Sequence, residues 1–275
     1  MNHSLEDDSP FKEDLEPLIV TLETDADWNK RFGAASKLFR LGNEKAVDPL
    51  IKALQNDPHK EMRRFCVDLL GRLGDERATW ALIATLRKGL EEKDATIVHH
   101  SKEALLKIRG SDLPSILSST VSDNEEFFEM RLLALELLGT LADTKSVESL
   151  IAIIKSPNSD GRIRARSIEQ LVYTGHLAGL QLILELLDIS SNKTFQRIVT
   201  RAISKTPFRN KTIAIRIGES LLKVMEYEES LKKEKDDELI RMCGEGIKQL
   251  ATNIGLQFNH FMDELLIVRK KQQGK

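Results

Sequence analysis

The sequence predicts an all-α fold, a right-handed α-solenoid of about six to seven similar helical hairpins. Two observations lead to this prediction. A unit of two short amphipathic segments recurs about every 33 residues along the chain. Aromatic residues make up only 5% of the sequence. The apolar residues are mostly Leu, Ile and Ala, which suit packing between helices better than the core of a sheet.

The clearest copy of the unit spans residues 62–86. Its first segment has apolar residues three and four positions apart, the spacing of one helical face: Met62, Cys66, Leu69, Leu70 and Leu73. Gly74-Asp75 should end this helix, because glycine accepts the left-handed conformation of a helix C-terminus. A second apolar set follows at Ala78, Leu82, Ile83 and Leu86. A hairpin of two such helices cannot bury both of its faces, so each must stack on a neighbouring copy.

The copies align on an arginine near the start of the first helix and on a helix-ending residue after it. The arginine position holds Arg31, Arg63, Arg131 and Arg164, with His99 and Gln196 in two weaker copies. The helix-ending position holds Gly42, Gly74, Gly110, Ala142, Gly175 and Pro207. The second helix repeats at residues 49–54, 81–86 and 149–154, and residues 17–22 match the first of these in register. We call the arginine-bearing helix of each copy inner and the other helix outer.

These repeats resemble the HEAT-repeat family, in particular the short bacterial and archaeal repeats named after the phycobilisome (PBS) lyases. The resemblance lies in an inner helix of the form hydrophobic-Arg-x-x-small-x-x-Leu-Leu-Gly-x-Leu-Gly-Asp and in the Ala-x-x-x-Leu-Ile-x-x-Leu helix that follows it. It covers roughly residues 11–225. It implies a solenoid whose inner helices line a concave side. It implies no single function, because fold and function separate easily.

Three parts are expected in chain order: a disordered acidic arm at residues 1–10, the repeat array at 11–225, and a charged loop with a C-terminal helical cap at 226–275. Outer helices are expected at residues 11–22, 49–54, 79–90, 112–118, 145–154, 178–187 and 212–225. Inner helices are expected at residues 27–41, 60–73, 95–108, 126–141, 162–173 and 193–205, and cap helices at 239–254 and 257–269. Asp48-Pro49 and Asp57-Pro58 mark helix starts, where an acidic cap and a proline suit the free N–H groups. Residues 122–125 resemble a capping box that would begin the helix at 126.

Composition narrows the classes of function. The formal net charge is −2, so counterion-driven affinity for nucleic acid should be weak. Residues 1–10 lack the basic region and apolar stretch of a secretory signal, and no run of about 18 apolar residues could cross a membrane. Cys66 and Cys243 are expected to be reduced thiols, with a redox switch as the alternative, which favours a cytoplasmic protein.

The most regular polar feature is a column of arginines preceded by aspartates. Its members are Asp25, Arg31, Asp57, Arg63, Asp123, Arg131, Asp160 and Arg164. The resemblance to HEAT repeats implies that such pairs are structural and bridge adjacent repeats. A basic stripe that binds phosphate is the rival interpretation, although Glu103, Glu136 and Glu169 dilute it.

The sequence predicts no catalytic residue, metal site or cofactor. His99-His100 is the only histidine cluster, and with Glu103 it falls short of a set of metal ligands. The HEAT-repeat hydroxylase that modifies a translation factor needs paired His-Glu steps, and no histidine here precedes glutamate. HEAT-like DNA glycosylases need a basic groove with an aromatic pair, whereas Trp28 and Trp80 fall on an inner and an outer helix. The balance of these observations is against an enzyme.

The residues expected to bind a partner face the concave side of the array. They are Trp28, Phe32, Lys60, Arg64, His100, Phe128 and Leu132. Exposed aromatic residues beside arginine are typical of binding hot spots; in the alternative, Phe32, Phe128 and Leu132 simply pack between repeats. The predicted function is a non-catalytic scaffold or assembly factor that binds another protein there. The resemblance alone suggests an alternative, a phycobilin lyase-like or accessory subunit that acts on phycobiliproteins.

Overall fold

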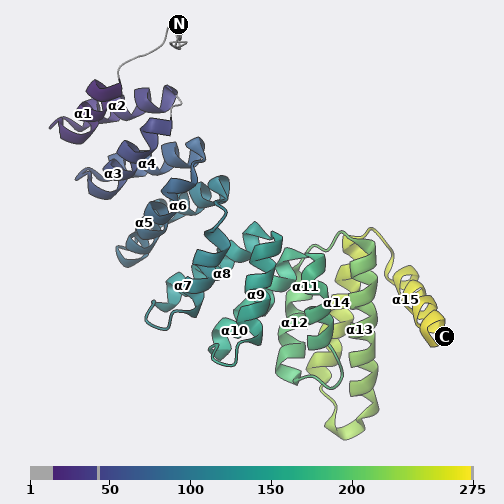
Figure 1. Cartoon of the computed structure of the whole chain (residues 1–275). Coiled ribbons are helices and arrows are strands. Elements are labelled where there is room, and N and C mark those ends of the chain that lie inside the picture. Colours follow the sequence, from purple (N-terminus) through teal and green to yellow (C-terminus); the bar gives the residue numbers. More distant parts are fainter. Residues whose placement is uncertain (1–14, 42–43, 274–275) are drawn as a thin grey trace, which may run out of the picture. The chain divides into compact units, whose positions relative to one another are not determined.

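The computed structural model describes residues 15–41 and 44–273, and every regular element within them is a helix. The described residues fall into two compact units, which we call unit 1 (within residues 15–113) and unit 2 (within residues 114–273). Each unit is a stack of helical hairpins (Figure 1). Within the described ranges, unit 1 has three hairpins and unit 2 has four. The predicted all-α solenoid is therefore confirmed. The acidic arm expected at residues 1–10 lies outside the described residues, as does Gly42.

Unit 1 contains three hairpins arranged in two layers. Its outer helices are α1 (Leu15–Thr24), α3 (Val47–Asn56) and α5 (Thr79–Glu91), and its inner helices are α2 (Trp28–Arg40), α4 (Lys60–Leu73) and α6 (Ala95–Ile108). The inner helices pack in series, α2 on α4 and α4 on α6, and the outer helices α1, α3 and α5 do the same. Repetition of one hairpin thus produces an inner and an outer layer.

The core of unit 1 lies between these layers. Met62, Cys66, Leu69 and Leu70, predicted to share one face of α4, are each at most 1% exposed. Full burial of one such side chain contributes roughly 1.5–3 kcal/mol. Helices α4 and α6 also approach closely, because a Cβ on Gly71 would lie 2.8 Å from the Cα of Ala104.

Unit 2 repeats the two-layer pattern. Its outer helices are α7 (Leu113–Ser122), α9 (Thr144–Lys155), α11 (Leu177–Leu186) and α13 (Lys211–Ser230). Its inner helices are α8 (Phe128–Leu141), α10 (Gly161–Thr174), α12 (Lys193–Lys205) and α14 (Asp237–Asn253). The inner helices pack in series from α8 to α14. Helix α15 (Phe258–Gln273) packs on α13 and α14, with Phe261 and Leu265 fully buried.

One local prediction was wrong. Helix α7 continues to Ser122 and α8 begins only at Phe128, so residues 122–125 do not cap α8. Instead, Asp123 Oδ1 accepts a hydrogen bond from the backbone N–H of Glu125. The charged run 226–238 contains the end of α13, a short 3-10 turn at Lys232–Glu234 and the start of α14, and Glu228 within it is buried. The Glu228 carboxylate accepts from Lys193 Nζ and from the backbone N–H of Asp236, both at 2.9 Å.

The helix-ending prediction is confirmed at Gly74 and Gly175, which cap α4 and α10 in the left-handed conformation. The residue that caps α6 is Arg109, at φ 49°, one position before Gly110. Ala142 caps α8 at φ 51°. A residue with a Cβ costs about 1–2 kcal/mol in this conformation, so both positions are strained.

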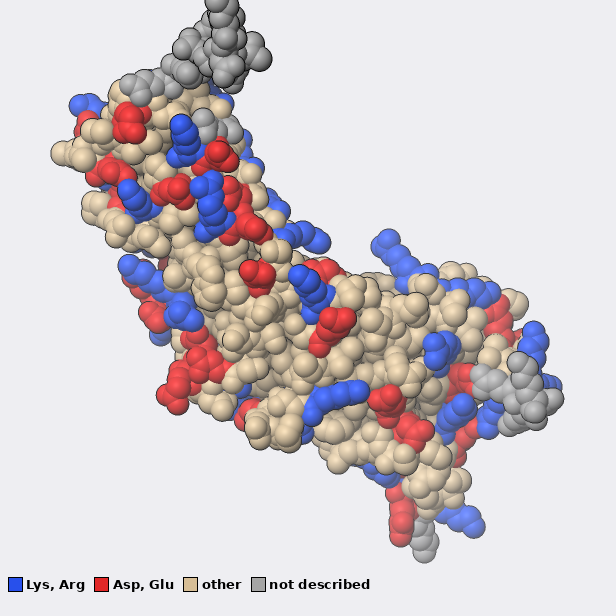
Figure 2. Space-filling model, viewed as in Figure 1, with Lys and Arg blue, Asp and Glu red and all other residues tan. Residues whose placement is uncertain are grey.

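Acidic and basic side chains are interspersed over the surface of unit 1, as Figure 2 shows for one face. Within the ranges that the structure describes, none of the helices is long and apolar enough to cross a membrane.

Candidate protein-interaction site

Four rings stack between α2 and α4 on the inner layer of unit 1. We call them the aromatic seam: Trp28, Phe32, His59 and Phe65. The Trp28 indole lies parallel to the His59 imidazole, with centroids 4.2 Å apart. The Phe32 and Phe65 rings stack at 3.8 Å, and Trp28 meets Phe32 edge-on at 6.3 Å. Trp28 and Phe32 lie one turn apart on α2, so the four rings form one continuous cluster across two repeats.

The protein covers the aromatic seam only in part. Phe32 is 38% exposed, and the other three side chains are half-buried. Beyond the seam, the Arg72 guanidinium lies over the Phe39 ring at 4.4 Å. Aromatic pairs contribute about 0.5–1.5 kcal/mol beyond the burial of their area. The seam therefore holds α2 against α4 and also presents ring surface to solvent.

A charged cluster occupies the next contact between inner helices, from α4 to α6. Asp94 caps α6 and accepts a hydrogen bond from the backbone N–H of Ile97. Lys60 Nζ lies 3.0 Å from the Asp94 carboxylate and Arg64 Nη2 lies 2.9 Å from it. Burial alone would raise the pKa of Asp94, but its bonds to Lys60, Arg64 and Ile97 outweigh this effect and lower it to about 2. Lys60 and Arg64, expected to bind a partner, thus also form ion pairs that join two successive inner helices.

His100 lies on α6 in the same inner layer. Together with His99 it lines a small pocket of about 190 Å³ between α4 and α6, which Asp68, Glu103 and Lys107 also line. The two imidazole centroids are 5.8 Å apart, and His100 is exposed. Among the residues described, no group of three or more His, Cys, Asp or Glu side chains is arranged to hold a metal ion.

Each arginine of the column joins its inner helix to the outer helix that precedes it in the chain. Each arginine is the fourth residue of an inner helix. Each donates to a backbone carbonyl near the C-terminal end of the preceding outer helix: Arg31 to Asp25 at 2.8 Å, Arg63 to Asp57 at 3.0 Å, Arg131 to Val121 at 2.8 Å and Arg164 to Ser156 at 2.8 Å. Gln196 does the same to Asp188 at 2.7 Å. Carbonyls at a helix end lack intrahelical partners, and the helix dipole favours a cation there.

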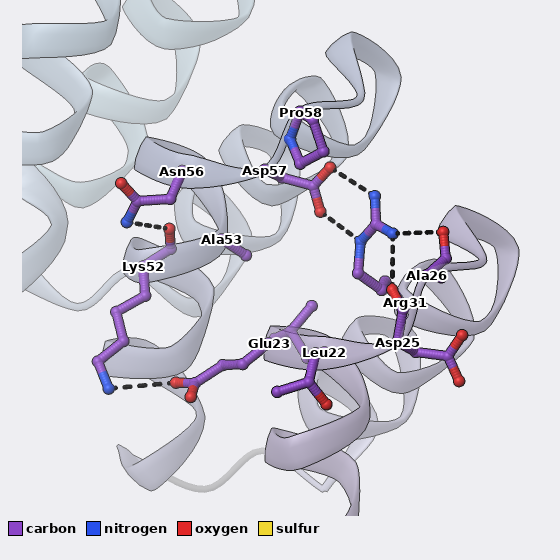
Figure 3. Close-up of a pocket in the computed structure, with 11 residues that line it drawn as sticks. Leu22, Glu23, Asp25, Ala26, Arg31, Lys52, Ala53, Asn56, Asp57 and Pro58 are labelled. Carbon is purple, nitrogen blue, oxygen red and sulfur yellow. Dashed lines mark hydrogen bonds and ion pairs between the residues drawn. The ribbon is translucent and has the colours of Figure 1, made fainter.

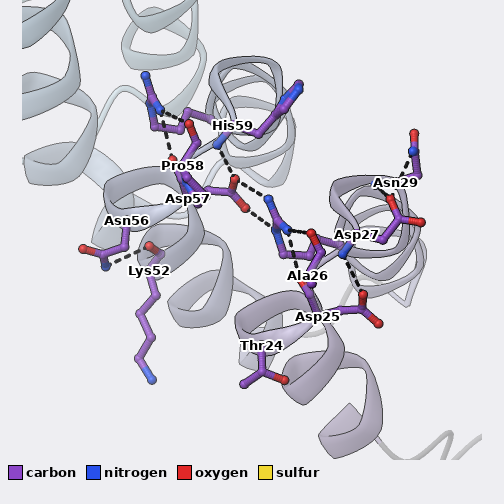
Figure 4. A network of polar contacts seen from close by, with 12 residues as sticks. Thr24, Asp25, Ala26, Asp27, Asn29, Lys52, Asn56, Asp57, Pro58 and His59 are labelled. Carbon is purple, nitrogen blue, oxygen red and sulfur yellow. Dashed lines mark hydrogen bonds and ion pairs between the residues drawn. The ribbon is translucent and has the colours of Figure 1, made fainter.

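Only one pair within this column bridges two repeats among the described residues. Arg31 donates to both carboxylate oxygens of Asp57, at 2.7 and 2.8 Å, and forms one wall of a pocket of about 490 Å³ (Figure 3). Asp57 also accepts from the backbone N–H of His59 (Figure 4). Burial opposes ionisation of Asp57, but these hydrogen bonds outweigh it and hold its pKa below the usual value.

The other aspartates of the column bond locally. The Asp25 carboxylate accepts from the N–H of Asp27, and Asp160 caps α10 by accepting from the N–H of Arg162. The expected bridges between repeats through Asp25, Asp123 and Asp160 are therefore replaced by turn and helix-cap hydrogen bonds.

Unit 2 places its two expected partner-binding residues on α8. Phe128 and Leu132 lie one turn apart, and both are half-buried. The Arg162 guanidinium of α10 lies over the Phe128 ring at 4.3 Å. Phe128 thus packs against the neighbouring repeat, as the alternative interpretation expected.

Sequence reasoning missed His59, Phe65 and Asp94. Phe65 follows Phe32 by one repeat period, so a search for recurring aromatic residues could have found it. The alignment on Arg31 and Arg63 has a period of 32 residues, which pairs Phe32 with Arg64 instead of Phe65. The role of Asp94 follows from its position before α6, where an acidic residue caps a helix.

Two solved structures are similar to this chain at low sequence identity. Human deoxyhypusine hydroxylase, in a complex with glycerol, is 16% identical at a TM-score of 0.36, over 86% of this chain and 96% of that one. The complex of CpcE and CpcF of phycocyanin lyase from Nostoc is 18% identical at a TM-score of 0.35, over 96% of this chain and 98% of that one. No curated protein matches the chain. A family model for HEAT repeats matches residues 15–105. The described residues therefore form an all-α solenoid, of which residues 15–105 match the HEAT-repeat model.

Proposed function

We propose that this protein is a non-catalytic scaffold that binds a protein partner through the inner layer of unit 1. The observation that supports the proposal best is the aromatic seam, in which partly exposed rings lie on neighbouring inner helices. Trp28 and Phe32 offer a rigid, amphipathic surface that loses little side-chain entropy on binding. Aromatic rings of this kind are among the residues that dominate protein–protein binding energy.

Charge favours a protein over a nucleic acid as the partner. The chain has 41 basic and 43 acidic residues, and unit 1 intersperses them on its surface (Figure 2). Arg64 and Lys60 are already paired with Asp94. A duplex or single strand needs several unpaired cations in a row to displace its counterions.

The proposed setting is the cytoplasm, where both thiols would stay reduced. Cys66 and Cys243 are free and buried, and burial raises the pKa of each to about 12. Very little of either thiol is then present as the reactive thiolate at neutral pH. This environment favours a structural role for both cysteines over a redox switch.

Affinity capture of the tagged full-length chain from its native lysate tests the proposal. The test variant carries Trp28→Ala and Phe32→Ala. The matched control is Trp80→Ala, because Trp80 is 67% exposed on the outer helix α5 of the same unit. Circular dichroism melting of each variant checks that the repeats remain folded.

A stoichiometric partner should be captured by the wild type and the control, and its recovery should fall at least tenfold with the double variant. Equal recovery by all three proteins would refute the inner-layer site, as would loss with Trp80→Ala alone. A visible absorption spectrum of the same eluate distinguishes the bilin lyase-like alternative. Bilin absorbance together with a phycobiliprotein would support that alternative and contradict a scaffold without a pigment.

A further inference from the structure

Three consecutive inner helices of unit 2 line a second pocket, to which the proposed function assigns no role. Helices α8, α10 and α12 line a pocket of about 400 Å³, which we call the unit 2 pocket. Its charged and aromatic lining residues are Glu136, Arg166, Glu169, Tyr173, Arg201 and Lys205. The pocket lies on the inner layer, on the same type of helix as the aromatic seam of unit 1.

Helix α12 carries a basic stripe that reaches into this pocket. Lys193, Arg197, Arg201 and Lys205 are spaced by four residues, which places them on one face, and α12 contains no acidic residue. The first two are used within the fold, since Lys193 bonds Glu228 and Arg197 bonds Asp236. Within the described chain, Arg201 and Lys205 form no ion pair. Two cations therefore face the pocket without a carboxylate partner.

The remaining charges do not cancel these two cations. Arg166 and Glu169 pair with each other on α10, at 2.6 Å, so together they contribute no net charge. Glu136 on α8 is the other acidic residue of the lining. The pocket thus keeps a net positive charge concentrated on α12 and a carboxylate on the opposite side, at α8.

Neutral groups that suit a peptide lie between these charges. Tyr173 is 58% exposed, so its ring can cover an apolar side chain while its hydroxyl remains hydrated. Gln170 also lines the pocket, and its amide can both donate to and accept from a peptide backbone. Three neighbouring helices span about 16–20 Å. About five or six extended residues cover that distance at roughly 3.3 Å each.

We propose that the unit 2 pocket binds an acidic peptide segment of the partner protein, with its carboxylates on Arg201 and Lys205 and an apolar side chain on Tyr173. The proposal rests on the scaffold function and deepens it by naming the chemistry of what is bound. A nucleic acid fits less well, because only two cations are unpaired and the phosphate backbone would run past Glu136.

Selection from a random twelve-residue peptide library on the full-length chain tests this proposal. The test variant is Arg201→Glu with Lys205→Glu. The matched control is Arg209→Glu with Arg216→Glu, an equal charge change at two exposed residues of unit 2 outside the pocket. The wild type and the control should enrich peptides with clustered Asp or Glu beside an apolar residue, and the test variant should not.

A fluorescein-labelled copy of the most enriched acidic peptide then measures affinity by anisotropy. Its Kd should rise at least tenfold with the test variant and severalfold with Tyr173→Ala, stay within twofold in the control, and rise with salt. The proposal is wrong if no acidic peptide is enriched or if the test variant binds it as tightly as the wild type. Tighter binding of a single-stranded RNA probe, lost in the test variant, would also overturn it.

These outcomes are separable from those of the scaffold test. A partner captured through Trp28 and Phe32 without any enrichment of acidic peptides leaves the proposed function standing and removes this inference. In the opposite outcome, acidic peptides bind through Arg201 and Lys205, and the variant without Trp28 and Phe32 still captures the partner. That result would refute the binding site in unit 1 and leave this inference standing.

Discussion

Replacing Asp94 with asparagine should destabilise unit 1 by about 2 kcal/mol at neutral pH. Asparagine keeps the shape of the side chain and caps a helix as well as aspartate does. The N–H of Ile97 therefore keeps its acceptor. What the substitution removes is the negative charge that Lys60 and Arg64 share at 3.0 and 2.9 Å.

The magnitude follows from the pKa of Asp94. Its neighbours lower that pKa from the ordinary value of 3.8 to about 2. Each pKa unit corresponds to about 1.36 kcal/mol of preference for the charged form in the folded state, which gives about 2 kcal/mol for this shift. The carboxylate is only 7% exposed and Arg64 is 20% exposed, whereas Lys60 is 51% exposed, so solvent screens the bond to Lys60 more than the bond to Arg64.

The pH dependence has a definite sign. A carboxylate with a lowered folded pKa contributes stability above its unfolded pKa and loses it as the pH falls through the folded value. The difference between wild type and Asp94→Asn should therefore be constant from about pH 7 to 5 and shrink between about pH 4 and 2.

Urea unfolding followed by tryptophan fluorescence measures this difference. Both tryptophans, Trp28 and Trp80, lie in unit 1, so the signal reports on that unit. Asp48→Asn is the control, because its pair with Arg77 is exposed and should contribute less than about 1 kcal/mol. A loss below about 0.5 kcal/mol for Asp94→Asn, or one that does not change with pH, would refute the reasoning.

Two further predictions concern backbone positions. Gly71→Ala should cost about 1–3 kcal/mol, because its Cβ would meet the backbone of Ala104 at 2.8 Å. Gly33→Ala, with nothing within 4 Å, should stabilise α2 by about 0.5–1 kcal/mol. The urea midpoints of the two variants should therefore move in opposite directions, and a shift in the same direction would contradict the close contact of α4 with α6. Ala142→Gly should stabilise unit 2 by up to about 1 kcal/mol by relieving a left-handed alanine. Calorimetry of the full chain that shows a lower transition temperature would contradict this.

The repeat pattern predicted most of the fold because each helix obeys local rules. Helices α4, α6 and α12 begin and end at the residues predicted for them. The burial of Glu228 within residues 226–238 escaped prediction, because its partner Lys193 lies on another helix, α12. Local composition cannot reveal that burial. It suggested a solvated charge run instead.

The candidate site was predicted in part for similar reasons. Trp28 and Phe32 could be recognised because the register of the arginines places them on an inner helix, on the side expected to face a partner. The partners of the arginine column could not be predicted, because they are backbone carbonyls, which are present at every residue and have no sequence signature. The aspartates beside Arg131 and Arg164 therefore looked like ion-pair partners, although each forms turn or cap hydrogen bonds.

The two units use one device to join successive inner helices. In unit 1, α4 begins with Lys60 and places Arg64 one turn later, and both pair with Asp94 at the start of α6. In unit 2, α12 begins with Lys193 and places Arg197 one turn later, and Arg197 pairs with Asp236 at the start of α14.

A cation at the first residue of an inner helix or one turn later is therefore explained by the contacts between repeats. Its presence is no evidence of a binding partner. The next two turns of α12 carry Arg201 and Lys205, for which the repeat has no acceptor. The aromatic seam also has more ring surface than the contact between repeats requires. Phe32 already joins two repeats by stacking on Phe65, yet 38% of its surface remains exposed. Some side chains have no role in the contacts that hold the repeats together. Their replacement should change the affinity for a partner more than the stability of the fold.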